Sequence, residues 1–202
     1  MDLLSAAEIA QRCQRNWSDR VVDGEDLDHI IRVCTTMPTK QNVPNYRLIV
    51  SQDAELNHRI VERAAYQPID VAQFAEGIQN HQLLASTVLL WYGDAQFSAK
   101  YNEPDHVFKE DLYSSVGISS GAAALAAASL GYRTGFCKCM EQDPLDALLR
   151  ESGVEISPHQ GFVCALGIGH ALEGYDHTVG VYRGRVTHEH ASRDKEIAIT
   201  LI

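Results

Sequence analysis

The chain has 202 residues, of which 45% are hydrophobic and 22% are charged, and these proportions are ordinary for one globular domain. Its net charge of −10 argues against a surface that binds nucleic acids or anionic membranes. No apolar run approaches the roughly 18 residues of a transmembrane helix. The five cysteines come without a secretory pattern and indicate thiols in a reducing cytosol. We therefore expect a single cytoplasmic domain over residues 1–202.

Several segments have the apolar spacing of helices that bury one face. The first is expected at 5–15, where Ser5 and Glu8 have the spacing of a capping box. The second begins near Asp23, has apolar residues at i, i+3, i+4 and i+7, and must end before Pro38. Further helices are expected at 53–65, 71–84, 105–130 and 144–151.

Strands alternate with these helices. The nearly continuous apolar and β-branched run at 86–92 is typical of a central strand that is covered on both faces. Other strands are expected at 47–51, 135–137 and 161–168, and the tail at 197–202 is also β-prone. This alternation predicts a layered α+β or α/β domain.

The second half of the long helix, at 117–129, consists almost entirely of small residues. Small side chains let another helix approach closely, so this face either packs within the chain or forms a dimer interface. The apolar tail favours the dimer, because a strand-like tail can cross to the sheet of a partner subunit.

A polar loop bounded by Pro38 and Pro44 leads directly into the strand at 47–51. Such a loop can offer backbone N–H groups and short polar side chains to a flat, hydrogen-bonding ligand. By itself it is an ordinary loop.

Two pairs of arginines lie near the ends of the chain. Arg12 and Arg15 are three residues apart, so they would share one face of a helix. Arg183 and Arg185 would point to one side of an extended segment. Each pair matches the oxygens of a phosphate group. The alternatives are a solvated helix end for the first pair and a surface turn for the second.

The remaining cysteines and histidines give weaker signals. Cys137 and Cys139 have the wrong spacing for CxxC redox chemistry or for a zinc pair. We interpret them as buried or incidental residues, with a redox-sensitive thiol as the alternative. His188 and His190 could face one side of an extended chain, but a solvated tail is favoured and no metal site is expected.

These motifs together resemble the flavin-dependent nitroreductases over most of the chain. The resemblance is carried by the segments 12–17, 38–50, 85–91, 117–131 and 167–169. It implies an α+β fold: a three-layer α/β/α sandwich around a mostly antiparallel sheet, in an intertwined homodimer. The C-terminal tail, from about 186 to 202, would reach the partner subunit.

The resemblance also implies that FMN binds at the subunit interface. Arg12, Cys13 and Arg15 would contact its phosphate, and Arg183 and Arg185 would complete that clamp. The ribityl chain and one ring face would be contacted by Pro38, Thr39, Lys40 and Asn42, and flavin N5 and O4 by the backbone N–H groups of Lys138 and Cys139. Cys13 replaces the usual serine, and 44–46 also depart from the family pattern. Ring-edge contacts are expected within 74–82, with Gln79, Asn80 and Gln82 as candidates.

The implied activity is reduction of FMN by NAD(P)H, followed by reduction of a small-molecule acceptor such as a nitroaromatic or a quinone. Two substrates that use one slot in turn imply ping-pong kinetics. Because the flavin supplies the chemistry, no side chain is expected as a catalytic acid or base. The alternatives are a dehalogenase, flavin-destructase or azoline-oxidase type of enzyme, with 94–105 as its lid, and a non-catalytic flavin-binding protein.

Overall fold

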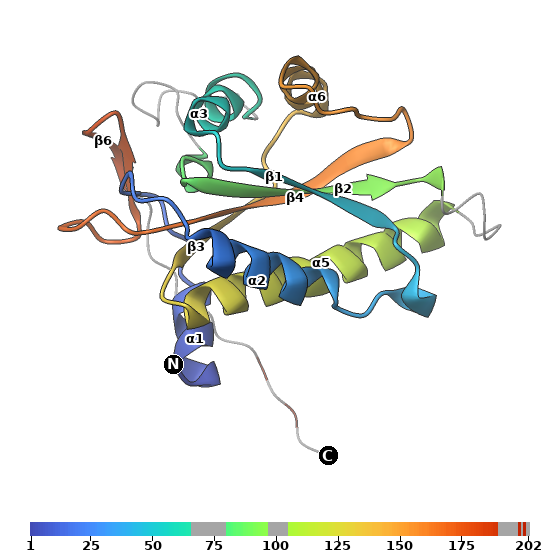
Figure 1. Cartoon of the computed structure of the whole chain (residues 1–202), viewed down its shortest axis with the longest axis horizontal. Helices are drawn as coiled ribbons and strands as arrows, with labels where there is room; N and C mark the ends of the chain where they lie inside the picture. Colours follow the sequence, from blue (N-terminus) through green and yellow to red (C-terminus); the bar gives the residue numbers. More distant parts are fainter. Residues whose placement is uncertain (66–79, 97–104, 190–197, 199, 201–202) are drawn as a thin grey trace.

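A four-stranded antiparallel sheet forms the middle layer of the structure (Figure 1). The structure is a computed structural model, and it describes residues 1–65, 80–96, 105–189, 198 and 200. The strands lie in the order β1-β2-β4-β3, so β1 and β3 are opposite edges. Their bounds are Tyr46–Ser51 for β1, Thr87–Asp94 for β2, Arg133–Cys137 for β3 and Gln160–Gly169 for β4.

The central strand β2 is buried along its whole length. Successive side chains of a strand point to opposite faces of the sheet, and the two faces of β2 meet different cores. Leu89 and Trp91 pack in the core on the side of α2 and α5. Leu90 and Tyr92 pack in the core that includes side chains of α3 and α6. The prediction of a strand covered on both faces is confirmed.

Helices cover both faces of the sheet and complete three layers (Figure 1). On one face lie α2 (Gly24–Thr35) and α5 (Asp105–Ser129), with α1 (Leu3–Ala10) beside α5. On the other face lie α3 (Ala54–Arg63) and α6 (Gln142–Glu151). The predicted α+β sandwich with a mostly antiparallel sheet is therefore confirmed.

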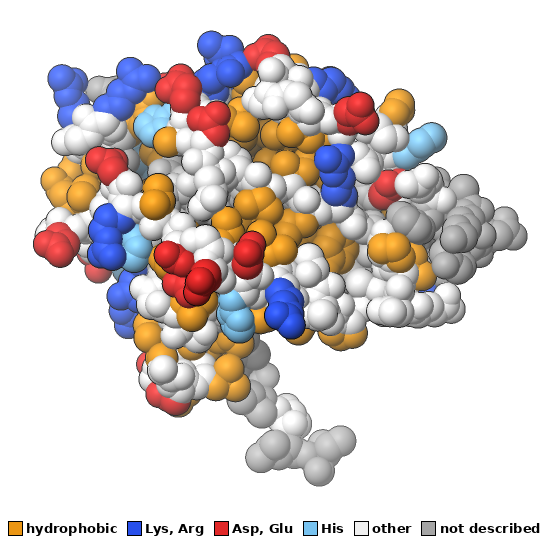
Figure 2. Space-filling model, viewed as in Figure 1, with side chains coloured by type: hydrophobic (Ala, Val, Ile, Leu, Met, Phe, Trp, Pro, Cys, Tyr) orange, Lys and Arg blue, Asp and Glu red, His pale blue; other side chains and the backbone are white. Residues whose placement is uncertain are grey.

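Local sequence signals account for α2 and for the end of α5. The Asp23 carboxylate accepts a hydrogen bond from the Glu25 N–H and caps the start of α2. The buried side of α2 faces the core, and acidic side chains gather over its outer face (Figure 2). After α5, Gly131 has φ of 94°, the left-handed conformation in which glycine commonly ends a helix. The predicted helix at 71–84 falls mostly outside the described residues, but His81–Leu83 form a 3-10 turn, η4.

The first helix differs from its prediction at both ends. Asp2, rather than Ser5, caps it: the Asp2 carboxylate accepts from the Leu4 and Ser5 N–H groups. The helix ends at Ala10, and Cys13 instead forms a parallel bridge with Thr134 of β3. Pairing with the edge of the sheet has overridden the local helical pattern. The prediction that Arg12 and Arg15 share a helical face is therefore wrong.

A second, two-stranded sheet was not predicted from the sequence. Strand β5 (Val179–Tyr182) pairs with β6 (Arg185–Glu189) as a hairpin. The predicted tail strand at 197–202 and His190 lie outside the described residues, apart from positions 198 and 200. Within the described part of the chain, no group of three His, Cys, Asp or Glu side chains is arranged to hold a metal.

The small residues of α5 lie on two sides of the helix, one packed within the chain and one lining a hollow. Ala123 and Ala127 are fully buried in the core beside α2. Gly117, Gly121 and Ala124 instead line an open hollow of about 340 Å³ between α1, α5 and β3. One side of the helix therefore packs within the chain, and another side is uncovered in the single chain. None of the helices described, α5 included, is long and apolar enough to cross a membrane.

Candidate functional site

The N-terminal segment 13–18 connects the free edge of β3 to the region of the hairpin. Gln14 N–H donates to the Thr134 carbonyl at 2.9 Å, on the β3 side of the segment. On its other side, Val181 N–H donates to the Arg15 carbonyl at 3.4 Å, and Ser18 N–H donates to the His170 carbonyl at 3.0 Å. The fold therefore brings residues 12–15 close to β3 and to β5, which are distant in sequence.

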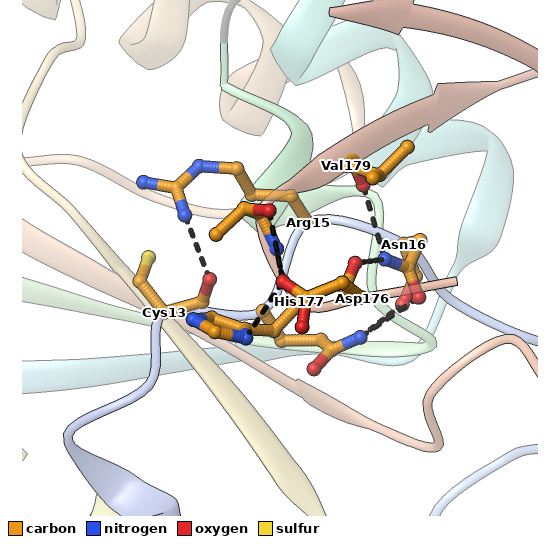
Figure 3. Close-up of polar contacts among 8 residues, drawn as sticks. Cys13, Arg15, Asn16, Asp176, His177 and Val179 are labelled. Carbon is orange, nitrogen blue, oxygen red and sulfur yellow. Dashed lines mark hydrogen bonds and ion pairs between the residues drawn. The ribbon is translucent and has the colours of Figure 1, made fainter. Parts of the chain in front are cut away.

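Arg15 is the most informative side chain of this cluster. Its Nη1 donates to the Cys13 carbonyl at 2.8 Å (Figure 3). Its Nε is buried and has no hydrogen-bond partner among the described residues. A buried donor without an acceptor costs about 1–3 kcal/mol, so this position favours an acceptor from outside the described chain. A guanidinium group is well suited to phosphate and other planar anions.

Asn16 holds this segment in place. It is fully buried, and its Nδ2 donates to the carbonyls of Asp176 at 2.6 Å and Val179 at 3.0 Å (Figure 3). Gln14 Nε2 in turn donates to Asn16 Oδ1 at 2.9 Å. These bonds join the arginine segment to the start of β5. Sequence analysis did not assign this role to Asn16, because its partners are about 160 positions away.

Two glycines let the 3-10 turn η4 lie directly on the sheet. Gly135 of β3 and Gly167 of β4 are register partners. A Cβ atom on Gly167 would clash with the Gln82 carbonyl oxygen, and one on Gly135 would lie 2.7 Å from the Gln14 carbonyl oxygen. A glycine inside a strand often marks such a close approach of backbone. The pair therefore positions Gln82 beside the arginine segment.

Side-chain amides from this turn reach the edge of β3. Gln82 Nε2 lies 3.5 Å from the Phe136 carbonyl oxygen, and Gln82 Oε1 is buried without a partner among the described residues. Asn80 Nδ2 donates to the Cys139 carbonyl at 2.6 Å. Cys13 Sγ is 3.6 Å from the same Phe136 oxygen. Asn80 and Gln82, which were predicted only as candidates, thus lie in one cluster with Cys13. Gln79 is outside the described residues.

Lys138 and Cys139 follow β3 and lie at the same edge. Both residues are exposed. The Lys138 ammonium group lies 4.5 Å from the centre of the Tyr113 ring of α5, a cation–π contact. The Met140 N–H donates to the Lys138 carbonyl at 3.0 Å, so the chain turns sharply around Cys139. Cys13 and Cys139 thus both lie at the edge strand β3, the first paired with Thr134 and the second two residues after the strand ends.

The predicted arginine pair at 183 and 185 lies in the turn of the β5–β6 hairpin. Arg183 has φ of 48° and Gly184 has φ of 74°, as in the two-residue turns that suit hairpins. Arg183 Nη2 donates to Glu62 at 2.9 Å, and its guanidinium lies over Tyr182. The extended geometry that was predicted for this pair is wrong, because the segment folds back on itself. Arg185 is exposed at the start of β6.

The polar loop at 38–42 lies far from this cluster within one chain. It precedes β1, and β1 is the sheet edge opposite to β3. Thr39 and Asn42 line a hollow of about 240 Å³, and Lys40 pairs with Asp111 at 2.6 Å. Pro38 is exposed. Neighbouring strands are about 4.8 Å apart, and three such spacings separate β1 from β3, beyond which the Arg15 segment lies. One chain alone does not bring the two together.

The sheet order and the helical layers define an α+β protein with a cluster of polar groups at the β3 edge. The model of the nitroreductase family matches residues 10–170 of the chain. The protein therefore belongs to the nitroreductase family. Members of this family are generally flavin-dependent, and membership supports the assignment of this protein as an oxidoreductase. A comparison with curated proteins finds no significant match.

Solved structures share the fold at low sequence identity. A nitroreductase family protein from Clostridium novyi NT is 14% identical, with a TM-score of 0.67 over 88% of this chain and 91% of that chain. A BluB-like flavoprotein from Clostridium difficile 630 is 16% identical, with a TM-score of 0.65 over 87% and 93%. An enone reductase of gut-bacterial fatty acid saturation is 15% identical, with a TM-score of 0.64 over 87% and 91%.

Proposed function

We propose that this protein is an FMN-dependent oxidoreductase that uses NAD(P)H to reduce a small-molecule acceptor by a ping-pong mechanism. The observation that carries the proposal is that two buried polar atoms, Nε of Arg15 and Oε1 of Gln82, have no partner among the described residues. One is a cationic donor and the other an acceptor, and both lie at the β3 edge. Membership of the nitroreductase family supports the flavin as their ligand.

The residues at this edge fit FMN in charge and in hydrogen bonding. The protein carries a net charge of −10, so a phosphate group needs local cations. Arg12 and Arg15 lie on either side of Cys13, which bridges to β3, and Arg183 and Arg185 lie at the hairpin, so we propose these four arginines as the cations. The amides of Asn80 and Gln82 suit the polar edge of a flavin ring, which has both donors and acceptors. The backbone N–H of Lys138 is a further donor proposed for the ring, whereas the N–H of Cys139 donates to Cys137 Sγ at 3.4 Å in the single chain.

When bound, FMN supplies the hydride chemistry that links a nicotinamide donor to an acceptor such as a nitroaromatic or a quinone. The side chains and backbone groups of the protein would bind and orient the cofactor. Arg15, Arg183 and Arg185 would bind the negatively charged phosphate group, and the amides of Asn80 and Gln82 would hold the edge of the ring. Accordingly, we assign no side chain as an obligate acid or base. The five cysteines are all free thiols, which fits the reducing cytoplasm proposed for the protein.

We further propose that a second copy of the chain completes the site. The loop with Pro38, Thr39, Lys40 and Asn42 lies at the opposite sheet edge from Arg15, so a partner subunit has to supply it. The hollow lined by Gly117, Gly121 and Phe136 offers a surface for that partner. Phe136 is 50% exposed beside it, and an exposed aromatic side chain of this kind is typical of an interface.

If the hollow beside α5 is the dimer interface, Gly121→Leu should strongly weaken the dimer. In the single chain nothing lies within 4 Å of a Cβ on Gly121, so the monomer tolerates the larger side chain. A partner packed on the hollow would be displaced, and we expect the dimer dissociation constant to rise by about 100-fold or more. Sedimentation equilibrium measures it, and FMN affinity should fall with it.

Ala147→Leu is the matched control, since Ala147 is an exposed helical position on α6, in the other layer. It should leave the dimer intact. A Gly121→Leu protein that remains dimeric would show that this hollow is not the interface, and a wild-type protein that is monomeric with FMN bound would exclude the shared site.

A second prediction concerns the reaction itself. The purified protein should be yellow, and NADH or NADPH added without oxygen should bleach the visible flavin band. Admission of a quinone or nitroaromatic should restore the colour. A colourless protein that FMN does not reconstitute would contradict the proposal. A yellow protein that neither nicotinamide reduces would favour a specialised flavin enzyme or a non-catalytic flavin-binding protein instead. The predicted lid at 94–105 lies mostly outside the described residues.

A further inference from the structure

Two thiols lie together where β3 ends. Cys137 is the last residue of β3 and is buried, whereas Cys139, two residues later, is exposed. The Cys139 N–H donates to Cys137 Sγ at 3.4 Å, so the backbone turns back over the Cys137 sulfur. Asn80 Nδ2 holds the Cys139 carbonyl at 2.6 Å. An exposed thiol therefore stands beside a buried one in a fixed turn.

The two thiols differ in acidity. A hydrogen bond from the Cys137 thiol lowers the pKa of Cys139 to about 6, and the Lys138 backbone contributes further in the same direction against the effect of burial. The same bond, together with burial, raises the pKa of Cys137. This bond therefore favours the thiolate form of Cys139, and the thiolate is the reactive form.

The other three cysteines do not combine an exposed side chain with a lowered pKa. Burial raises the pKa of Cys13, Cys34 and Cys164. Cys13 is the nearest alternative partner, but its Sγ lies 3.6 Å from the Phe136 carbonyl oxygen and is directed at the β3 backbone. Cys137, whose sulfur contacts the Cys139 backbone, is the better placed partner.

We propose that Cys139 and Cys137 form a peroxide-responsive thiol pair that closes to an intrachain disulfide. The Cys139 thiolate attacks a hydroperoxide: an S–O bond forms, the O–O bond breaks, and an alkoxide or hydroxide leaves. Cys139 is then a sulfenic acid. The Cys137 sulfur attacks the Cys139 sulfur, the S–S bond forms, and the hydroxyl group leaves as water with the Cys137 proton. The two cysteines lose two electrons, which reduce the peroxide.

The disulfide has a structural consequence at the β3 edge. It draws the Cys139 side chain toward Cys137 and alters the turn whose carbonyl holds Asn80. On the proposed function this turn also faces the flavin, so oxidation would weaken FMN binding. That consequence rests on the proposed function, whereas the thiol chemistry does not.

The sequence provides a direct assay, because Lys138 lies between the two cysteines. Trypsin cleavage after Arg133, Lys138 and Arg150 gives the peptides 134–138 and 139–150, with one cysteine in each. We expect hydrogen peroxide treatment of the folded protein to join these peptides into one mass that a reductant separates. Before oxidation, Cys139 should react with iodoacetamide at least about tenfold faster than Cys34 or Cys164.

Two variants complete the test. In Cys137→Ser, peroxide should leave Cys139 as a sulfenic acid that dimedone traps. In Cys139→Ser, Cys137 should stay reduced. The proposal is overturned if the two peptides do not join while glutathione in the same solution is oxidised, or if Cys139 joins to Cys13. It is also overturned if Cys137 oxidises equally fast in Cys139→Ser. Peptide mapping of the wild-type protein needs neither variant, and it reads the thiols whether or not FMN is bound.

Discussion

Replacing Arg15 with alanine is expected to lower FMN affinity by about 100-fold, equivalent to ~3 kcal/mol of binding free energy. The reason is the position of its guanidinium, in which one nitrogen holds the Cys13 carbonyl and the buried Nε has no partner among the described residues. Charge-assisted hydrogen bonds of this kind contribute about 1.5–3 kcal/mol each. Fluorescence titration of the apoprotein with FMN measures the loss.

Two controls separate binding from structure in this experiment. Arg15→Lys keeps a positive charge without the planar fork, so its affinity should lie between those of the wild type and Arg15→Ala. Arg32→Ala, an exposed arginine in the last turn of α2, should bind FMN as the wild type does. Unchanged affinity in Arg15→Ala, with the wild-type melting temperature, would exclude Arg15 from the cofactor site.

Gly167→Ala is expected to lower the free energy of unfolding by about 3 kcal/mol or more. The new methyl group would clash with the Gln82 carbonyl oxygen, which belongs to the backbone of η4 and has no rotamer with which to move away. Either the turn lifts from the sheet or β4 shifts. Because the same turn carries Asn80 and Gln82 to the β3 edge, FMN affinity should fall as well. Urea unfolding followed by circular dichroism measures the stability.

Gly161→Ala is the matched control on the same strand. There the added Cβ would lie 3.3 Å from Gln142 Oε1, the end of a flexible side chain, so we expect a change within about 0.5 kcal/mol. Equal stability of the two variants would show that the position of η4 does not depend on the absence of a side chain at Gly167. A loss of stability in Gly167→Ala without any loss of FMN affinity would separate the turn from the cofactor site.

Much of the layered fold could be read from local patterns. The run that became β2 is nearly continuously apolar because both of its faces are covered. The spacing of Leu27, Ile30 and Cys34 places one face of α2 in the core. Gly131 ends α5 with positive φ. Each of these signals arises from the conformation or burial of the segment itself, so a short stretch of sequence contains it.

The site was harder to predict, because its geometry arises between distant segments. Arg12 and Arg15 fit a helical spacing, yet the chain around Cys13 pairs with Thr134 instead. Arg183 fits an extended spacing, yet it sits in a hairpin turn and pairs with Glu62. The first segment meets β3 across more than 100 positions, and the second forms a hairpin turn whose arginine binds a glutamate that is similarly distant in sequence.

The sequence by itself thus determined the order of the main helices and of the four strands of the central sheet, the buried faces and the family resemblance, since these depend on residue type and local spacing. The tertiary structure alone decided which polar groups meet at the β3 edge. It brought Gln82 onto paired glycines, left Arg15 Nε buried without a partner among the described residues, and set Cys139 against Cys137. Such placements depend on strand register and close packing, which no local pattern contains.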